Sequence, residues 1–248
     1  LCATYPGHSQ MRPSYPDLPG IHPSPNIQTS PDVYEVENRA ADPDQRIEQA
    51  MQAIAAWDGK VVLDLGAGTG FHIPRFQQAT HVFAVEPHDE SRLLAMQRIS
   101  ALSLLNVSIL KGSAEYIPLR DQSVDICHSR FAYFFAPDCL PGLRELERVI
   151  RPGGTAFIVD NDLVEGTFAE WLQQSPYYKN ATASEVSQFW REQGFREQSI
   201  ASEWRFARRE DLEKVVRLEF GDVLADKLLA QHEALQISYH YKLYYRSY

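Results

Sequence analysis

The chain has 248 residues, with 24 lysines and arginines against 33 aspartates and glutamates, and therefore a formal net charge of −9 at pH 7. Its length suits one large domain or two small ones, and 44% hydrophobic residues allow a sizeable buried core, which excludes disorder of the whole chain. The acidic balance argues against a broad electrostatic footprint for nucleic acid or for an anionic membrane surface.

The cysteines Cys2, Cys127 and Cys139 contain no C-x-x-C pair. Neither a disulfide framework nor a thiolate zinc site is therefore predicted, no metal is expected, and the plain interpretation is a reducing, cytoplasmic setting. No apolar run approaches the roughly 20 residues that cross a bilayer, and the N-terminus lacks a basic region followed by an apolar core. Membrane insertion and secretion are not expected.

A proline-rich segment opens the chain. Residues 1–31 contain seven prolines, which argues against helix or central strand and predicts an extended arm. Apolar residues at three- and four-residue spacing then predict an amphipathic helix from about Asp44 to Trp57. We therefore divide the chain into an arm, residues 1–43, and a domain, residues 44–248.

Short β-branched or apolar runs next alternate with helical patterns. Strands are predicted near Val61–Leu65, His81–Glu86, Val107–Lys111, Val124–His128 and Thr155–Asp160. The clearest helices between them are Glu90–Leu102 and Leu140–Ile150. Such alternation predicts a parallel sheet with helices on both faces.

The rhythm changes after residue 160. Helices are expected near 164–173, 184–193 and 209–231, and strands near 198–206 and 237–245. Two strands joined by a helix at the end of an α/β domain indicate that the last strand inserts antiparallel to the rest. The predicted fold class is α/β, a doubly wound, mostly parallel seven-stranded sheet with an antiparallel last strand.

The most informative stretch is the segment VVLDLGAGTGF, in which a buried strand runs into a glycine loop that opens a helix. Gly66, Gly68 and Gly70 allow positive φ and close approach of a ligand, and a helix N-terminus favours a negative group. A nucleotide-type cofactor is therefore expected. The dinucleotide fingerprint G-x-G-x-x-G would require glycine where this chain has Phe71, which argues against a nicotinamide cofactor.

Glu86 ends the second predicted strand, 20 residues after Gly66. A carboxylate at that position can accept hydrogen bonds from both hydroxyls of a ribose lying across the strand ends. The alternative is that the glycines form only a tight strand-to-helix turn and that Glu86 is only a solvated charge at a strand end. The joint occurrence of the glycine loop and Glu86 at this spacing favours the cofactor site.

At this point the chain resembles the class I S-adenosylmethionine-dependent methyltransferases. The resemblance covers residues 33–160 well and the remainder by topology alone. It rests on five motifs in their usual order: Val62–Gly70, Glu86, Gly112–Leu119, Ser123–Ile126 and Leu146–Gly154. It implies a Rossmann-like methyltransferase fold and S-adenosyl-L-methionine as the cofactor.

The resemblance also implies roles for single residues. The backbone of the glycine loop would meet the methionine part of the cofactor, Glu86 the ribose, and Pro87 and His88 the adenine. Ser113 replaces the usual aspartate of the family, so the contact of Ser113 and Ala114 would be through the backbone. The predicted cofactor-binding residues are Tyr34, Arg39, Gly66, Ala67, Gly68, Gly70, Glu86, Pro87, Ser113, Ala114 and Ser129.

Two further groups follow from the same resemblance. His128, Ser129 and Arg130, after the fourth strand, would lie near the sulfonium. Tyr34, Asn38 and Arg39 would fold over the cofactor from the N-terminal side, and a surface turn before the helix is the alternative for that stretch.

Methyl transfer requires a nucleophile in line with the sulfonium–methyl bond, so positioning supplies much of the catalysis. Where the acceptor carries a proton, His128 is the first candidate for a catalytic base, because it ends the fourth strand where ligands bind, and Tyr133 is the second. The alternative for His128 is a structural hydrogen bond to backbone at the strand end. His72 would support the cofactor carboxylate or the loop.

Three other stretches each have two interpretations, one as part of a binding site and one as ordinary structure. The aromatic run Phe131–Phe135 forms either an apolar wall or core packing. Asp160–Asp162 either lines the acceptor pocket or forms a solvated turn. The basic and aromatic stretch Trp204–Arg209 suits a nucleic-acid or phosphate partner, although its interleaved acids favour a solvated helix start.

We therefore predict a methyltransferase that acts on an O, N or C atom of a small molecule, as a monomer or a homodimer. The alternatives are an RNA methyltransferase, which the net charge disfavours, a cofactor-binding protein without catalysis, and a nicotinamide-dependent dehydrogenase, which Phe71 disfavours.

Overall fold

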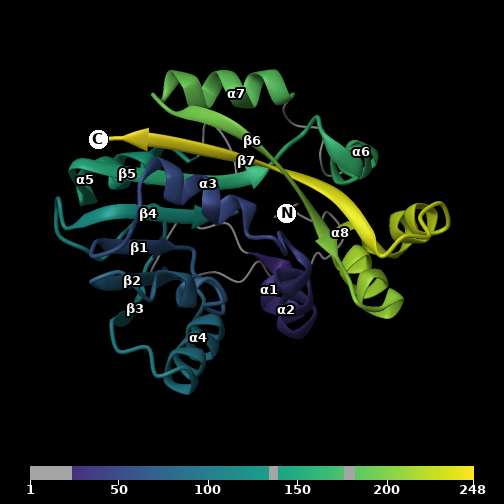
Figure 1. Cartoon of the computed structure of the whole chain (residues 1–248), viewed down its shortest axis with the longest axis horizontal. Coiled ribbons are helices and arrows are strands. Elements are labelled where there is room, and N and C mark those ends of the chain that lie inside the picture. Colours follow the sequence, from purple (N-terminus) through teal and green to yellow (C-terminus); the bar gives the residue numbers. More distant parts are fainter. Residues whose placement is uncertain (1–23, 134–138, 176–181) are drawn as a thin grey trace.

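A computed structural model describes residues 24–133, 139–175 and 182–248. Its strands form one seven-stranded sheet in the order β3-β2-β1-β4-β5-β7-β6 (Figure 1). The strands are β1 (Val61–Leu65), β2 (His81–Glu86), β3 (Val107–Lys111), β4 (Val124–Arg130), β5 (Ile150–Asn161), β6 (Arg196–Arg205) and β7 (Gln236–Ser247). Strands β1 to β5 pair in parallel, and β7 runs antiparallel between β5 and β6. The predicted fold class is confirmed.

The helices cover both faces of this sheet. They are α1 (Pro25–Thr29), α2 (Pro31–Ala40), α3 (Arg46–Ile54), α4 (Asp89–Ala101), α5 (Leu140–Val149), α6 (Gly166–Gln174), α7 (Ala183–Glu192) and α8 (Arg209–Leu229), with a short 3-10 helix, η1 (Ile73–Phe76). Within the parts of the chain that the structure describes, no helix is both long enough and apolar enough to cross a membrane.

Successive residues of the central strands enter two separate cores. Val62 on β1 packs in a cluster with Trp57, Phe76 and Tyr241, whereas the next residue, Leu63, packs in a second cluster that includes residues of α5 and α7. Side chains of a strand alternate between the faces of a sheet, so a continuous apolar run such as VVLDL is what a doubly covered central strand requires.

The extended arm expected for residues 1–31 is wrong for residues 25–31, which contain α1 and the start of α2. Pro25 and Pro31 each lie in the first turn of a helix. Proline is well tolerated there, because the first backbone N–H groups of a helix have no intrahelical partner and the ring sets φ near the helical value. Residues 1–23 lie outside the described residues.

The prediction of a helix directly after the glycine loop is also wrong. The loop is followed only by the short 3-10 helix η1, which has Pro74 in its first turn. Residues 71–80 are all that joins the loop to β2, which leaves no room for a longer helix. The amides of Gly66 and Ala67 donate instead to the carbonyl of Val85. The helix-terminus contribution to anion binding is therefore absent at this loop.

The first two helices lie at the carboxyl edge of the sheet, between α4 and α8 (Figure 1). Helix α2 buries Ala40 and packs Val33 and Val36 against the larger core cluster, to which Phe220 of α8 also belongs. Helix α8 itself bends at Gly221, whose φ of 72° and ψ of 159° are not helical. This arrangement places residues 24–40 over the ends of β1 and β4.

Candidate functional site

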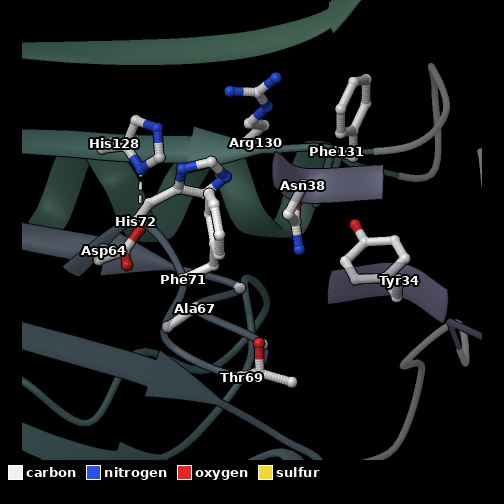
Figure 2. A pocket seen from close by; sticks show the side chains of 12 residues that line it. Tyr34, Asn38, Asp64, Ala67, Thr69, Phe71, His72, His128, Arg130 and Phe131 are labelled. Carbon is white, nitrogen blue, oxygen red and sulfur yellow. Dashed lines mark hydrogen bonds and ion pairs between the residues drawn. The ribbon is translucent and has the colours of Figure 1, made fainter. Parts of the chain in front are cut away.

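A small cavity lies where β1 and β4 end and α2 crosses above them (Figure 2). Its volume is about 40 Å³, enough for a few water molecules and far below the roughly 300 Å³ of small-molecule pockets. Its walls come from α2, the glycine loop and β4. The lining residues are Tyr34, Asn38, Asp64, Gly66, Ala67, Gly68, Thr69, Phe71, His72, His128, Arg130 and Phe131.

The glycine loop, residues 66–70, needs its glycines for two reasons. Gly66, Gly68 and Gly70 have φ of 74°, 55° and 76°, a region that other residues rarely adopt. A Cβ on Gly66 would also lie 2.6 Å from the Cβ of Ala132, and one on Gly68 would lie 2.7 Å from Cδ1 of Ile27. Helix α1 and the residues after β4 therefore close directly over the loop.

Glu86 holds the glycine loop from the neighbouring strand. Its Oε2 accepts a hydrogen bond from the Gly68 amide and its Oε1 accepts one from the His88 amide, both at 2.9 Å. Burial raises the pKa of Glu86, and the two backbone hydrogen bonds oppose that rise. Because each carboxylate oxygen has more than one lone pair, Glu86 keeps capacity to accept hydrogen bonds from ribose hydroxyls.

His128 and Asp64 form a buried pair at the floor of the cavity. They are register partners on β4 and β1, and the Nδ1 atom of His128 lies 2.7 Å from Oδ1 of Asp64. The histidine side chain is 5% exposed and the carboxylate 3%. The partner of His128 is thus a carboxylate rather than strand backbone. When Nδ1 carries the proton, the Nε2 atom is free to accept one.

His72 lies beside this pair, with its ring centroid 5.8 Å from that of His128. Burial, and then the charges of Arg130 and Arg75, hold the pKa of His72 well below its ordinary value, so the ring is neutral near pH 7. Within the described residues, Nδ1 of His72 and Oδ2 of Asp64 are buried without a hydrogen-bond partner. These two polar atoms on one cavity fit a ligand that carries both donors and acceptors.

The first two helices are fastened to the site by polar contacts that the sequence did not predict. Glu35 of α2 accepts hydrogen bonds from the Thr69 hydroxyl at 2.7 Å and from Arg98 of α4 at 2.5 Å. Asn26 of α1 donates to Glu219 of α8 at 2.6 Å. These contacts join residues far apart in sequence, and nothing in the local pattern of either partner indicates them.

The structure brings eight of the residues predicted for the site to the cavity and leaves others outside it. The cavity is lined by Tyr34, Asn38, Gly66, Ala67, Gly68, His72, His128 and Arg130, and also by Phe131 of the aromatic run. Gly70 lies outside the cavity and packs against Ala95 of α4. Glu86 also lies outside it and is connected to it by the hydrogen bond from the Gly68 amide. The other predicted residues outside the cavity are Pro87, Ser113, Ala114, the buried Ser129 and the exposed Arg39. The residues that the sequence did not assign to cofactor or catalysis are Asp64, Thr69 and Phe71.

Tyr133, the second candidate base, does not line the cavity. Its hydroxyl is buried and donates to the carbonyl of Gly142 at 3.3 Å. Burial raises the pKa of Tyr133 well above its ordinary value, which disfavours the phenolate that a base would need. Tyr133 is therefore a packing residue, as the core alternative for Phe131–Phe135 held. Residues 134–135 of that run lie outside the described residues.

The stretch Trp204–Arg209 is structural in the same way. Trp204 and Phe206 are buried in the core. Arg205 pairs with Asp44 and Glu203, Arg208 with Asp211, and Arg209 with Glu213. The interleaved acids thus neutralise the basic residues, and the rings are not available to stack on bases.

Asp160 and Asp162 differ in their surroundings. Asp162 accepts hydrogen bonds from the amides of Val164 and Glu165, so it caps a turn. Burial raises the pKa of Asp160 to about 6, against the hydrogen bond that it accepts from the Asn161 amide. The surroundings therefore disfavour the charged form of Asp160 and do not disfavour that of Asp162.

Replacing Asp160 with asparagine is expected to stabilise the protein above neutral pH. An unfolded aspartate titrates near about 3.9, so the folded state prefers the protonated form, and its stabilisation is lost as pH rises through about 6. The free energy of unfolding should rise by about 1–3 kcal/mol near pH 7.5 and stay unchanged near pH 4. Urea denaturation at both pH values measures this, with the exposed Asp58→Asn as control; an equal change at both would contradict it.

Comparisons with known proteins agree with this geometry. Residues 63–158 match a family described as a methyltransferase domain. The malonyl-[acyl-carrier protein] O-methyltransferase of Pectobacterium atrosepticum is 34% identical over 128 residues, which is 51% of this chain and 47% of that protein. The chain spans about half the length of the curated relatives it matches, or less.

Solved structures share the fold over most of the chain. A SAM-dependent methyltransferase from Aquifex aeolicus aligns with a TM-score of 0.55 at 20% identity, over 86% of this chain and 97% of that one. The [4+2]-cyclase SpnF aligns with a TM-score of 0.59 at 16% identity, over 82% of this chain and 81% of that one. Residues 63–158 are therefore similar in sequence to a methyltransferase domain, and the chain shares the fold of the S-adenosylmethionine-dependent methyltransferases.

Proposed function

We propose that this chain transfers the methyl group of S-adenosylmethionine to an O, N or C atom of a small-molecule acceptor. The observation that carries the proposal is the joint position of the Glu86-held glycine loop and the His128–Asp64 pair at one edge of the sheet. The first supports cofactor binding, and the second supplies a group that can take a proton next to it. The free, buried thiol of Cys127 fits the cytoplasmic location that we propose with it.

The residues present fit the cofactor. Gly66 and Gly68 present backbone without side chains, and Glu86 retains acceptor capacity for the two ribose hydroxyls. The unpartnered atoms of His72 and Asp64 suit the amino and carboxylate groups of the methionine part. When bound, S-adenosylmethionine supplies an activated methyl group on a positively charged sulfur.

The chain then orients the acceptor and receives its proton. His128 accepts the proton at Nε2, while Asp64 holds the Nδ1–H and stabilises the imidazolium that results. The low exposure of both side chains strengthens this interaction, because buried charges are weakly screened. Helices α1 and α2 exclude water from the site.

The segment Tyr34–Arg39 and the residues after β4 form a lid in this proposal. The cavity beneath them is too small for a nucleoside, and Ile27 lies on Gly68, so the N-terminal helices have to move before the cofactor enters. We expect amide hydrogen exchange of residues 24–40 and 129–133 to slow when S-adenosylhomocysteine is added.

The control for this exchange experiment is the Glu35→Gln variant, in which the contacts to Thr69 and Arg98 are weakened. Residues 24–40 should then exchange faster in the free protein. Protection of the glycine loop alone would contradict the lid. Residues 134–138 lie outside the described residues.

Turnover tests the proposed function. Protein is incubated with S-adenosylmethionine labelled on its methyl carbon and with fractionated metabolite pools, and label in product and formation of S-adenosylhomocysteine are measured together. A labelled small molecule supports the proposal and identifies the acceptor. Label in RNA alone, or binding without any methylated product, would contradict it; the cyclase with the same fold shows that the fold alone does not decide the reaction.

A further inference from the structure

Arg130 is the last residue of β4 and lines the cavity. Side chains alternate along a strand, so Arg130 emerges from the same face as His128, two residues before it. Figure 2 shows its guanidinium on the far side of His72 from the glycine loop, near Asn38 and Phe131. Arg130 therefore belongs to the same wall of the cavity as the candidate base His128.

The charge of Arg130 lacks a carboxylate partner. The side chain is partly buried, yet it forms no salt bridge with any acid in residues 24–133, 139–175 or 182–248. Over those same ranges, every other arginine is either exposed or pairs with an acid. A partly buried guanidinium without a counter-ion is costly unless a ligand supplies the negative charge.

Glu37, a nearby acid of α2, does not supply it. Burial and the neighbouring carboxylate of Glu219 raise the pKa of Glu37 well above its ordinary value, and the opposing effect of Arg130 is smaller. Burial therefore disfavours the charged form of Glu37. After burial, Arg130 is the next cause of the lowered pKa of His72, so the positive charge of Arg130 acts on the cavity.

Two rings fix the guanidinium in place. Its central carbon lies 5.7 Å from the ring centroid of Phe131 and 5.1 Å from that of Tyr241. Contact with ring faces orients a guanidinium and leaves most of its N–H donors available, and burial raises the pKa of Tyr241 while Arg130 beside it opposes that rise. The planar donor fork is thereby left for a planar acceptor, and a carboxylate matches it with two parallel hydrogen bonds.

We propose that Arg130 binds a carboxylate of the methyl acceptor, so that the acceptor is a carboxylic acid. This rests on the proposed function, in which the sulfonium would share the cavity. Two cations facing one cavity repel each other, and an anionic acceptor between them removes that repulsion.

The test is a calorimetric titration of the protein, with and without saturating S-adenosylhomocysteine, using benzoate and malonate as probes. Benzamide and malonamide are the matched neutral compounds. We expect the carboxylates to bind and the amides not to bind. Arg130→Gln should weaken carboxylate binding at least about tenfold, and Arg130→Lys, which keeps the charge but not the fork, should weaken it less.

Arg144→Gln, an exposed arginine of α5, is the matched control and should bind as the wild type does. Thermal melting establishes that each variant folds, and Arg130→Lys replaces Arg130→Gln in the comparison if Arg130→Gln does not fold.

Equal carboxylate binding by wild type and variant, or no carboxylate binding by wild type, would overturn the inference. So would a tenfold loss of S-adenosylhomocysteine binding in Arg130→Gln, which would assign Arg130 to the cofactor carboxylate. If wild type fails to bind S-adenosylhomocysteine at all, the proposed function fails, and titration of the free protein still tests Arg130.

Discussion

Replacing Glu86 with alanine is expected to weaken binding of S-adenosylhomocysteine at least about tenfold, since hydrogen bonds to a charged group contribute about 1.5–3 kcal/mol each. The variant also removes the acceptor for the amides of Gly68 and His88, so the glycine loop loses its support. Both effects act in the same direction. Calorimetry with the purified variant measures the dissociation constant.

Two matched variants separate these contributions. Glu86→Gln keeps acceptor oxygen for one amide but loses the charge, and it should bind more weakly than wild type and more tightly than Glu86→Ala. Glu233→Ala removes an exposed acid far from the loop and should change nothing. An unchanged dissociation constant in a folded Glu86→Ala protein would show that this carboxylate contributes to cofactor binding neither through the ribose nor through the loop.

Replacing His128 with asparagine is expected to lower kcat about 10²- to 10⁴-fold for an acceptor that loses a proton, which is the range for a general base. The dissociation constant of S-adenosylhomocysteine should stay within a few-fold of wild type, because binding does not require the proton transfer. Asp64→Asn should lower kcat as well, since Asp64 holds the imidazole tautomer. Single-turnover kinetics and calorimetry measure the two quantities.

The double variant His128→Asn, Asp64→Asn distinguishes a catalytic pair from a structural one. Removing one partner of a buried pair leaves the other unpaired, at a cost of about 3–5 kcal/mol if it is charged. Two neutral amides can hydrogen-bond each other, so the double variant should recover stability without recovering turnover. Recovery of both stability and turnover would assign the pair to structure alone.

Much of the fold follows from local signals in the sequence. The alternation of apolar runs and helical periodicity predicts strands β1 to β5, since a covered parallel strand is apolar on both faces. Two errors came from residues whose effect depends on position. Proline at Pro25 and Pro31 begins a helix rather than preventing one, and the glycine loop leads into η1 because residues 71–80 are too few for a longer helix.

The candidate site was predictable only in part. Gly66 and Glu86 are separated by 20 residues within one strand–loop–strand unit, so the spacing of the glycines and the acid indicates a cofactor loop. The pairing of His128 with Asp64 joins residues 64 positions apart and depends on the register of β4 on β1. The difference between Arg130, which has no acidic partner among the described residues, and the arginines that pair with acids can likewise be recognised only from the three-dimensional positions of the acidic side chains.

The most direct test of the account is a calorimetric comparison of S-adenosylmethionine, S-adenosylhomocysteine and NAD on the wild-type protein. The glycine spacing, Glu86 and the family match all favour the sulfonium cofactor and its product. The account predicts saturable binding of both S-adenosyl compounds at one site and no measurable binding of NAD. Tight binding of NAD with no response to either S-adenosyl compound would contradict it.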